Sequence, residues 1–141
     1  MMYTAVEDNE VLDWIGMEPQ SALGLDAVVE QGLPVDSPAL LKHKGLTFSE
    51  IAEIVISPRT LKHRKARGER LSEEETDRMV RVARTVLLAE NVFGDPAKSL
   101  LWLRTPDERI GGRKPLSMLR TDAGARVVES MLWQIDEGVY S

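Results

Sequence analysis

Cysteine is absent from this 141-residue chain, and histidine occurs only twice. Disulfides and thiolate metal sites are therefore excluded, and a cysteine-free composition is typical of a reducing compartment. Two histidines without a cluster of carboxylates make a poor metal site, so we expect neither a metal nor another cofactor. Apolar runs stay well short of the roughly 18 residues of a membrane span. The first residues lack the basic start and apolar run of a secretory signal. We expect a soluble, cytoplasmic protein without membrane contact.

Basic residues are missing from the first part of the chain. No lysine or arginine precedes Lys42, whereas the same stretch holds eight acidic residues. Residues 57–70 then hold six Lys or Arg against one Glu, inside a protein of net charge −5. Such a block is either a solvated helix face or a contact for an acidic partner such as nucleic acid. Its position in the chain, described below, favours the second interpretation.

Helix-start signals are frequent. Proline follows a potential capping side chain at Ser37-Pro38, Ser57-Pro58 and Asp95-Pro96, where its missing N–H carries no penalty. Thr47 with Glu50, and Ser72 with Glu75, have the spacing of capping boxes. These signals predict helix starts near residues 38, 48, 58, 73 and 96.

Apolar residues between these signals recur at helical spacing. One stripe is expected in residues 72–92 and a second in residues 121–136, whereas strict alternation, the pattern of a strand, does not occur over any long run. We also expect Glu74–Arg78 and Asp77–Arg81 pairs on the first helix. The fold class predicted is all-α. The stripes consist of Met79, Val82, Ala83, Val86 and Leu87, and of Ala123, Val127, Val128, Met131, Leu132 and Ile135.

We divide the chain into three parts. Residues 1–36 form an acidic N-terminal segment with short helices expected at 10–15 and 22–31. Residues 37–92 form a helical unit of the DNA-binding kind, and residues 93–141 form a C-terminal module. No Gly/Ser-rich linker separates the last two parts, so we expect them to share the long helix as a rigid spine.

Residues 47–67 have the layout of a helix-turn-helix. A first helix over 49–55 turns Ile51 and Ile54 inward, and a second helix begins at Ser57-Pro58. The second helix of such a unit lies in the major groove of DNA, with hydroxyls and amides near phosphates. Arginines suit guanine and lysines suit phosphate. The residues predicted to contact DNA are Ser57, Arg59, Thr60, Lys62, Arg64, Lys65 and Arg67.

The turn of this unit departs from the usual pattern. Helix-turn-helix units of this kind carry a glycine in the turn, whereas Val55-Ile56-Ser57 stands here. Without a residue tolerant of positive φ, the two helices must cross by another route. The alternative to groove binding is therefore a unit that serves folding or dimerisation.

The C-terminal module is rich in apolar residues for its size. Residues 100–103 are Leu-Leu-Trp-Leu, too apolar for an exposed helix, and Trp133 lies off the stripe of the last helix. The excess indicates a second buried surface, covered by another copy or another protein. The alternative is a compact monomeric core that absorbs both tryptophans. The loop Gly111-Gly112-Arg113 lacks the strand-loop-helix setting of a phosphate-binding P-loop.

Residues 25–141 resemble the Xre/MbcA/ParS antitoxin family, most closely in the C-terminal module. The resemblance also covers Ser57-Pro58-Arg59-Thr60-Leu61 and residues 71–84. It is strongest at Phe93-Gly94-Asp95, Trp102-Leu103, Pro106, Gly111-Gly112-Arg113, Pro115, Leu119, Gly124, Val128 and Gly138.

This resemblance implies an antitoxin that binds and neutralises a RES-domain toxin, an ADP-ribosyltransferase-like protein that acts on NAD. It also implies a homodimer that represses its own promoter. A pocket that binds NAD offers cationic donors and flat apolar walls. The acidic and aromatic C-terminal tail of this chain is expected to occupy that pocket; the alternative is a disordered tail. The residues expected to contact toxin are Trp102, Arg113, Trp133, Asp136, Glu137, Val139, Tyr140 and Ser141.

A stand-alone dimeric transcriptional regulator is the alternative to an antitoxin. An enzyme is not expected, because the sequence offers no nucleophile–base pair, carboxylate dyad or metal-ligand spacing.

Overall fold

The computed structural model describes residues 6–16 and 24–138 of the chain. Within these ranges it is helical, and its β pairing is limited to an isolated bridge between Asp107 and Arg113. The predicted all-α class is confirmed. Over the same ranges, no helix combines the length and apolarity that crossing a bilayer requires.

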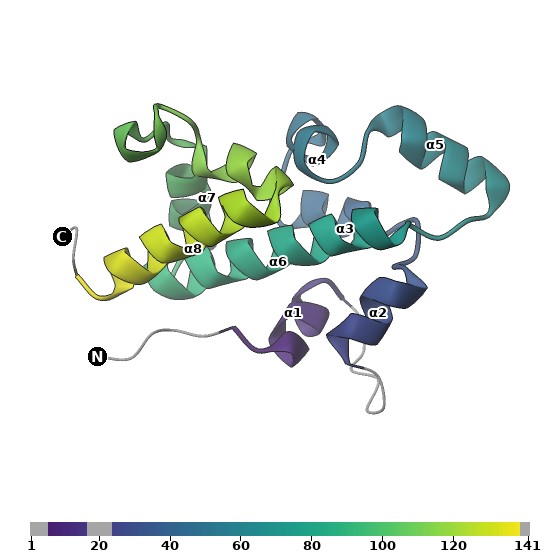
Figure 1. The fold of residues 1–141 in the computed structure, drawn as a ribbon, viewed down its shortest axis with the longest axis horizontal. Helices are drawn as coiled ribbons and strands as arrows, with labels where there is room; N and C mark the ends of the chain where they lie inside the picture. The colour runs from purple at the N-terminus through teal and green to yellow at the C-terminus, as the bar shows by residue number, and fades with distance from the viewer. Residues whose placement is uncertain (1–5, 17–23, 139–141) are drawn as a thin grey trace.

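Eight α-helices and two short 3-10 helices follow one another in the described ranges (Figure 1). The N-terminal helices expected at 10–15 and 22–31 appear close to those positions, as the first two of the set. The elements are α1 Asp8–Trp14, α2 Leu25–Gln31, α3 Pro38–His43, α4 Phe48–Ile54, α5 Pro58–Arg67, α6 Glu73–Phe93, α7 Pro96–Arg104, η1 Glu108–Ile110, η2 Pro115–Arg120 and α8 Asp122–Asp136.

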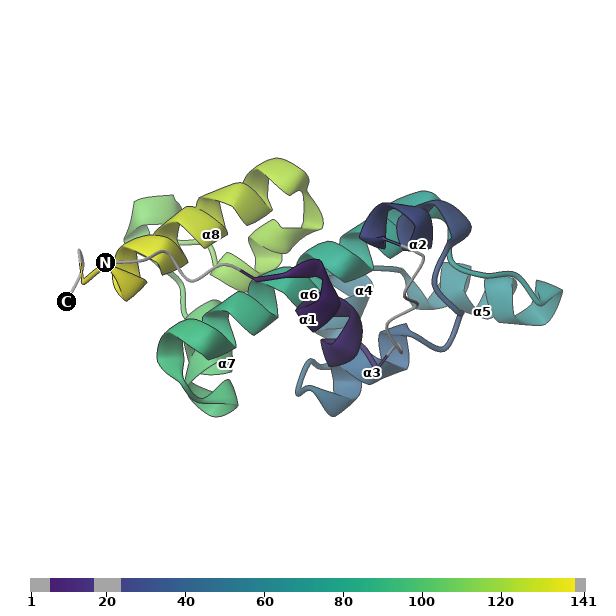
Figure 2. The same cartoon turned by 90° about the horizontal axis from the view of Figure 1, so that it is seen from below.

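The 21-residue helix α6 runs through the centre of the molecule (Figure 1). Helices α1 and α2 pack on it from one side, and α7 and α8 pack on it near its C-terminal half (Figures 1 and 2). Met79, Val82 and Val86 of the expected stripe are fully buried. Leu87 is only half-buried, whereas Leu88 is buried. The stripe is wider than expected because other helices cover α6 on more than one side.

The stripe expected on α8 is partly wrong. Val128, Met131 and Leu132 are buried as expected, but Ala123 and Val127 are exposed and Ala125 is buried instead. The reason is the approach of α8 to η2. Gly124 sits so close to the carbonyl of Met118 that the helix is rotated to bring residues 125, 128 and 132 inward.

Most of the expected caps are present. Both capping boxes, Thr47 with Glu50 and Ser72 with Glu75, are formed. Ser57 and Asp95 cap α5 and α7 through their side chains. Ser37 does not cap α3, because its backbone is already helical (φ −58°, ψ −38°) and its side chain makes no capping bond.

One of the two ion pairs expected on α6 is replaced by another contact. Asp77 and Arg81 pair at 2.6 Å as expected. Arg78 instead donates from Nε to the carbonyl of Val55 at 2.8 Å. Arg78, which the sequence pattern pairs with Glu74, thus binds the carbonyl at the end of α4. This hydrogen bond connects the turn of the helix-turn-helix to α6.

Candidate DNA and toxin interfaces

The turn between α4 and α5 closes without glycine. Val55 ends α4 at φ −119°, ψ −68°, and the amide of Ile56 donates to the carbonyl of Ile51 at 3.2 Å. Every non-glycine residue that the structure describes has a negative φ. The helices therefore join without a left-handed residue, through extended Ser57, with Val55 and Ile56 buried beneath the turn.

Helix α5 projects from the rest of the molecule (Figures 1 and 2). Each of its residues is at least partly exposed. Leu61 is half-buried and packs against the core. The apolar contacts of α5 by themselves would therefore hold this helix only weakly against the rest of the molecule.

A double hydrogen bond from Arg64 to Glu75 supplies the second anchor of α5. The Nε and Nη2 atoms of Arg64 donate to the two carboxylate oxygens of Glu75 at 2.7 and 3.0 Å. Nη1 donates to Glu69 at 3.2 Å. Burial raises the pKa of Glu75, but the hydrogen bonds from Arg64 and from the Ser72 amide outweigh it and leave this pKa below its usual value. Such bidentate, charge-assisted pairs are among the stronger polar contacts in proteins.

The role predicted for Arg64 therefore conflicts with this structure. A guanidinium with three carboxylate contacts cannot also grip a guanine without breaking them. The sequence signal was ambiguous, because Glu75 looked fully used as the capping-box partner of Ser72. In the fold it also lies beside α5, and its carboxylate serves both roles.

The remaining residues predicted to contact DNA lie on three sides of α5. Ser57 donates its hydroxyl to that of Thr60 at 2.9 Å, on the side facing α6. Arg59 and Arg67 are exposed. Lys62 and Lys65 line a groove that α5 forms with α3 and α4. These residues therefore do not form a single reading face.

In the C-terminal module, Trp102 is half-buried and packs on Phe93, with ring centroids 5.8 Å apart. Leu100 and Leu103 are buried, whereas Leu101 is 69% exposed. The apolar excess expected in residues 100–103 thus falls on Leu101, and its cover by another polypeptide stays a prediction. Helix α7 packs on α6 and η2, and Leu101 is left exposed on its outer side.

The Gly111-Gly112 loop places Arg113 against its own backbone. Both glycines take positive φ angles, 72° and 77°. The chain then turns back so that the Asp107 amide donates to the Arg113 carbonyl at 3.1 Å, and Arg113 Nε donates to the carbonyl of Ile110 at 2.8 Å. Arg113 remains exposed overall, so the loop holds its stem and leaves part of its guanidinium accessible.

The outer face of α8 carries apolar surface. Trp133 is 39% exposed and Val127 43% exposed. Trp133 lines a shallow depression with Arg126, Glu129 and Ser130, and burial raises the pKa of Glu129. Asp136 and Glu137 follow at the end of the helix and are half-buried. The last three expected toxin contacts, Val139, Tyr140 and Ser141, lie outside the described residues.

Trp102 and Trp133 are thus not brought to one spot, since Trp102 is packed on Phe93 and Trp133 opens to the surface of α8. In the part of the chain that the structure describes, no group of three or more His, Asp or Glu side chains is placed to hold a metal ion.

Two family models match the chain in tandem. The model described as "Antitoxin Xre-like helix-turn-helix domain" matches residues 24–84. The model described as "Antitoxin Xre/MbcA/ParS C-terminal toxin-binding domain" matches residues 88–138. A relative named "Antitoxin Xre", from Pseudomonas putida, is 41% identical over 98 residues, or 70% of this chain and 62% of the relative.

The chain belongs to the Xre/MbcA/ParS antitoxin family.

Other relatives of this family member carry similar names. A Yersinia enterocolitica "Antitoxin Xre" is 34% identical over 61% of this chain and 59% of its own length. A "Prs ADP-ribosylating antitoxin" from Sphingobium is 26% identical over 77% of this chain and 82% of its own length. The alignments thus span less than two thirds of the first two relatives. Antitoxin and helix-turn-helix families are typically non-enzymatic.

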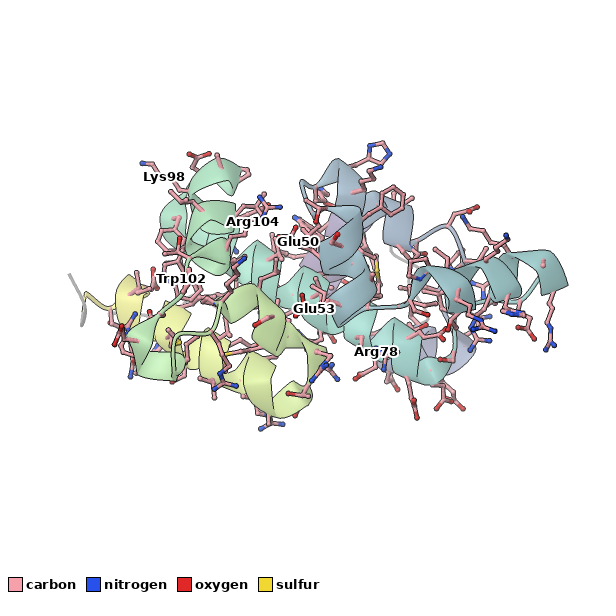
Figure 3. The ribbon with its side chains drawn as sticks, turned by 90° about the horizontal axis from the view of Figure 1, so that it is seen from above. Glu50, Glu53, Arg78, Lys98, Trp102 and Arg104 are labelled. Carbon is pink, nitrogen blue, oxygen red and sulfur yellow. The ribbon has the colours of Figure 1, made fainter. Side chains whose placement is uncertain are left out.

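An ion pair that sequence patterns missed joins the two family modules of this chain. Arg104, at the end of α7, donates from Nε and Nη2 to the carboxylate of Glu50 on α4, both at 2.7 Å, and Figure 3 shows the two side chains facing each other. Nη2 also donates to the carbonyl of Gly45 at 2.6 Å. The hydrogen bond from Arg104 is the main reason why the pKa of Glu50 is lowered. Only the capping-box role of Glu50 could be read from the sequence.

Proposed function

We propose that this protein binds and neutralises a cognate toxin through residues 93–141, and that it represses its own operon through the α4–α5 unit. The observation that carries the proposal is the tandem match to the two antitoxin family models on two packed helical modules. The exposed apolar residues of the C-terminal module supply an apolar surface suited to binding another protein.

Three exposed apolar side chains support toxin binding by this module: Leu101, Val127 and Trp133. Large exposed apolar groups, aromatic ones above all, are typical of partner surfaces and of the few residues that dominate binding energy. Leu101 lies on α7 and the other two lie on α8. The proposed toxin interface therefore extends over two helices of the matched toxin-binding domain.

The class of toxin is a further part of the proposal. We infer a RES-domain toxin that acts on NAD, and the name of the Sphingobium relative supports a partner with ADP-ribosylating chemistry. Asp136 and Glu137 place carboxylates at the start of the C-terminal tail. Such groups suit a pocket whose donors bind a diphosphate.

Co-expression tests the proposed neutralisation. A strain that makes the proposed RES-domain toxin is expected to grow only when this chain is also made. A variant carrying Leu101→Glu and Trp133→Ala should lose protection, because it removes apolar contact and adds a charge to the interface. Glu30→Ala is the control, since Glu30 is exposed on α2, outside the C-terminal module. Growth protected equally by all three proteins contradicts the proposed surface.

Truncation tests the proposed role of the tail. Removal of residues 137–141 is expected to restore toxin activity while binding through α7 and α8 persists, which a pull-down of the two proteins measures. An equally potent inhibitor after truncation contradicts occupation of the toxin site by the tail.

The proposed homodimer and repressor are tested together. Sedimentation of the purified chain should give twice its 15.8 kDa mass, and the protein should retard a DNA fragment from its own promoter. A monomer that binds the toxin but not the promoter would keep the antitoxin proposal and remove the repressor. A promoter-binding dimer that ignores the toxin would instead indicate a stand-alone regulator.

A further inference from the structure

An apolar groove lies between α3, α4 and α5, away from the C-terminal module. It has a volume of about 360 Å³. Its floor comes from all three helices and the turn, with Pro38, Ile51, Ile56 and Leu61 among its lining residues. This volume is in the range of sites that accept a few side chains or a small ligand, and such sites are mostly apolar.

One apolar residue of the groove is unusually exposed. Phe48, at the start of α4, lines the groove and is 67% exposed. The Nζ of Lys42 lies 3.8 Å from the centre of its ring, a cation–π contact that holds the ring in place. The ring thus stands at the groove as an open apolar wall, held by a neighbouring charge.

The charged residues of the groove are nearly all basic. Lys42, Lys62 and Lys65 line it, and Asp36 is the single acidic residue among the lining residues that the structure describes. The balance is +2 from these four side chains, in a protein whose net charge is −5. All three lysines are exposed; Lys42 is engaged with the Phe48 ring, and the ammonium groups of Lys62 and Lys65 face solvent at the groove.

We propose that this groove binds a short amphipathic segment of a partner protein, with apolar side chains on one face and carboxylates on the other. An apolar floor flanked by lysines complements such a segment in both respects, in the manner of a helix held in a groove. Positive surface that meets negative surface also sets specificity.

Duplex DNA matches the same groove less well. Its phosphates would satisfy the lysines, but nothing in the phosphate backbone fills an apolar floor or covers the Phe48 ring. A second copy of this chain is also a poorer match through Leu101. This exposed leucine is flanked on α7 by Lys98, whose charge the lysines of the groove repel.

The proposal has a consequence that rests on the proposed DNA binding. Lys62 and Lys65 are among the residues predicted to contact phosphates and also line the groove. A partner segment that engages them competes with DNA. Binding of that partner in the groove is then expected to release this protein from its promoter and so to end repression.

A direct binding experiment uses the full chain and two designed peptides. Both are capped helical peptides with leucines at positions i, i+3 and i+7. The remaining residues of one are mostly glutamates, and those of the other are mostly lysines. Fluorescence anisotropy of the labelled peptides at low ionic strength is expected to show saturable binding of the glutamate peptide and none of the lysine peptide. Equal binding of the two, or of neither, overturns the proposal.

Variants locate the binding. Lys62→Glu combined with Lys65→Glu should lower the affinity for the glutamate peptide by about tenfold or more, and Phe48→Ala should lower it by about fivefold. Lys98→Glu is the matched control on α7, where Lys98 points away from α4 (Figure 3), and it should change affinity by less than about twofold. All changed side chains are exposed, and circular dichroism checks that the variants stay folded. Unaltered affinity in the Lys62/Lys65 variant overturns the proposal.

Two further arms separate the possible occupants. Self-association that Phe48→Ala abolishes would show that a second copy fills the groove, and this outcome overturns the proposal. A promoter fragment that displaces the glutamate peptide supports both the groove and the competition. If the peptide binds and no DNA does, the groove proposal stands and the proposed repressor fails.

Discussion

Gly124 shows how a single residue sets the orientation of α8. A Cβ atom added there would strike the backbone carbonyl of Met118 in η2, and it would lie 3.0 Å from the Thr121 hydroxyl. Backbone cannot move aside as a flexible side chain can. The absence of a side chain at this position therefore allows α8 to lie directly against η2.

Gly124→Ala is expected to destabilise the protein by about 1–3 kcal/mol. The sign is informative, because the same substitution within a helix ordinarily stabilises by about 0.5–1 kcal/mol. Urea unfolding measures the change. Arg126→Ala, on the exposed side of the same helix, is the control and should shift stability by about 0.5 kcal/mol or less. A stabilised G124A protein would contradict the close approach.

The Glu75 carboxylate accepts three hydrogen bonds from two residues. Its carboxylate accepts from the Ser72 amide and from two nitrogens of Arg64, and its side chain is only 7% exposed. We expect Glu75→Gln to cost about 1.5–3 kcal/mol in urea unfolding, since a charge-assisted bond is lost and Arg64 loses its main counter-charge. Asp122→Asn removes the exposed Arg126 pair and should cost about 0.5 kcal/mol or less. Equal effects would contradict the structural role of Glu75.

The pKa of Glu75 and that of Glu50 are both lowered in the folded protein. Each carboxylate therefore stabilises the fold fully above the pKa of an unfolded glutamate, about 4.3. That stabilisation is lost as pH falls through the lower folded pKa. Unfolding free energy should be flat near neutral pH and fall below about pH 4. In Glu75→Gln the fall should be shallower, and an unchanged pH profile would contradict the assignment.

At the scale of elements, α5 combines high charge with weak attachment. It depends on half-buried Leu61 and on the Arg64–Glu75 pair, while its other basic side chains remain exposed. A helix that projects in this way suits contact with a large partner such as DNA. Its position in that contact depends on α6, which supplies Glu75.

If α5 binds DNA, four basic side chains are available for phosphate contacts: Arg59, Lys62, Lys65 and Arg67. Log affinity for the promoter should then fall with log salt at a slope near −0.9 per contact, about −3.6 for all four. Replacing Lys62 by Ala should reduce the slope by about one contact. Fluorescence titrations at several salt concentrations measure it. A slope near zero, or one untouched by the substitution, contradicts phosphate binding by α5.

On the scale of the whole molecule, the two family modules share a helix and an ion pair. Residues 24–84 and 88–138 match separate family models, yet both matches lie partly on α6. Arg104 and Glu50 join the modules again from α7 to α4. Each module also needs α6 to cover its apolar side chains, as buried Met79 and Val86 indicate.

We therefore expect the protein to unfold as one cooperative unit. Trp14 lies on α1, ahead of both matched regions, and donates to Glu90 at 3.0 Å, whereas Trp102 lies on α7 in the second module, so the two report on different parts of the molecule. In variants that keep only one of these tryptophans, urea transitions monitored by fluorescence should have the same midpoint. Arg104→Gln should lower both midpoints together. Two separate transitions would show that the modules are independent domains.

Local signals identified the elements of this fold well. Both capping boxes, the prolines at helix starts and the 3.6-residue period predicted helices near their observed positions, because these features depend on neighbours in sequence. The same signals failed for the sides of helices. Nothing local to residues 121–136 shows that Gly124 approaches η2, so the predicted stripe included exposed Val127 and omitted Ala125.

The candidate sites divide in the same way. The basic composition of α5 and the apolar excess of α7 and α8 are properties of short segments, and they could be recognised with no knowledge of the fold. Long-range partners could not. The sequence predicted Arg64 as a contact to a DNA base, because only the fold places Glu75 beside it. In the same way, no sequence pattern connects Arg104 to Glu50, which lies 54 positions earlier.

The sequence by itself determined an all-helical protein with a basic helix and an apolar C-terminal module, because cap chemistry, helical period and charge act over a few residues. Only the tertiary structure decided which charges are free and which are paired, and it alone assembled the lysine-lined groove from α3, α4 and α5. These properties depend on side chains that meet across helices, and their distances are set by how the helices pack on α6 and on one another.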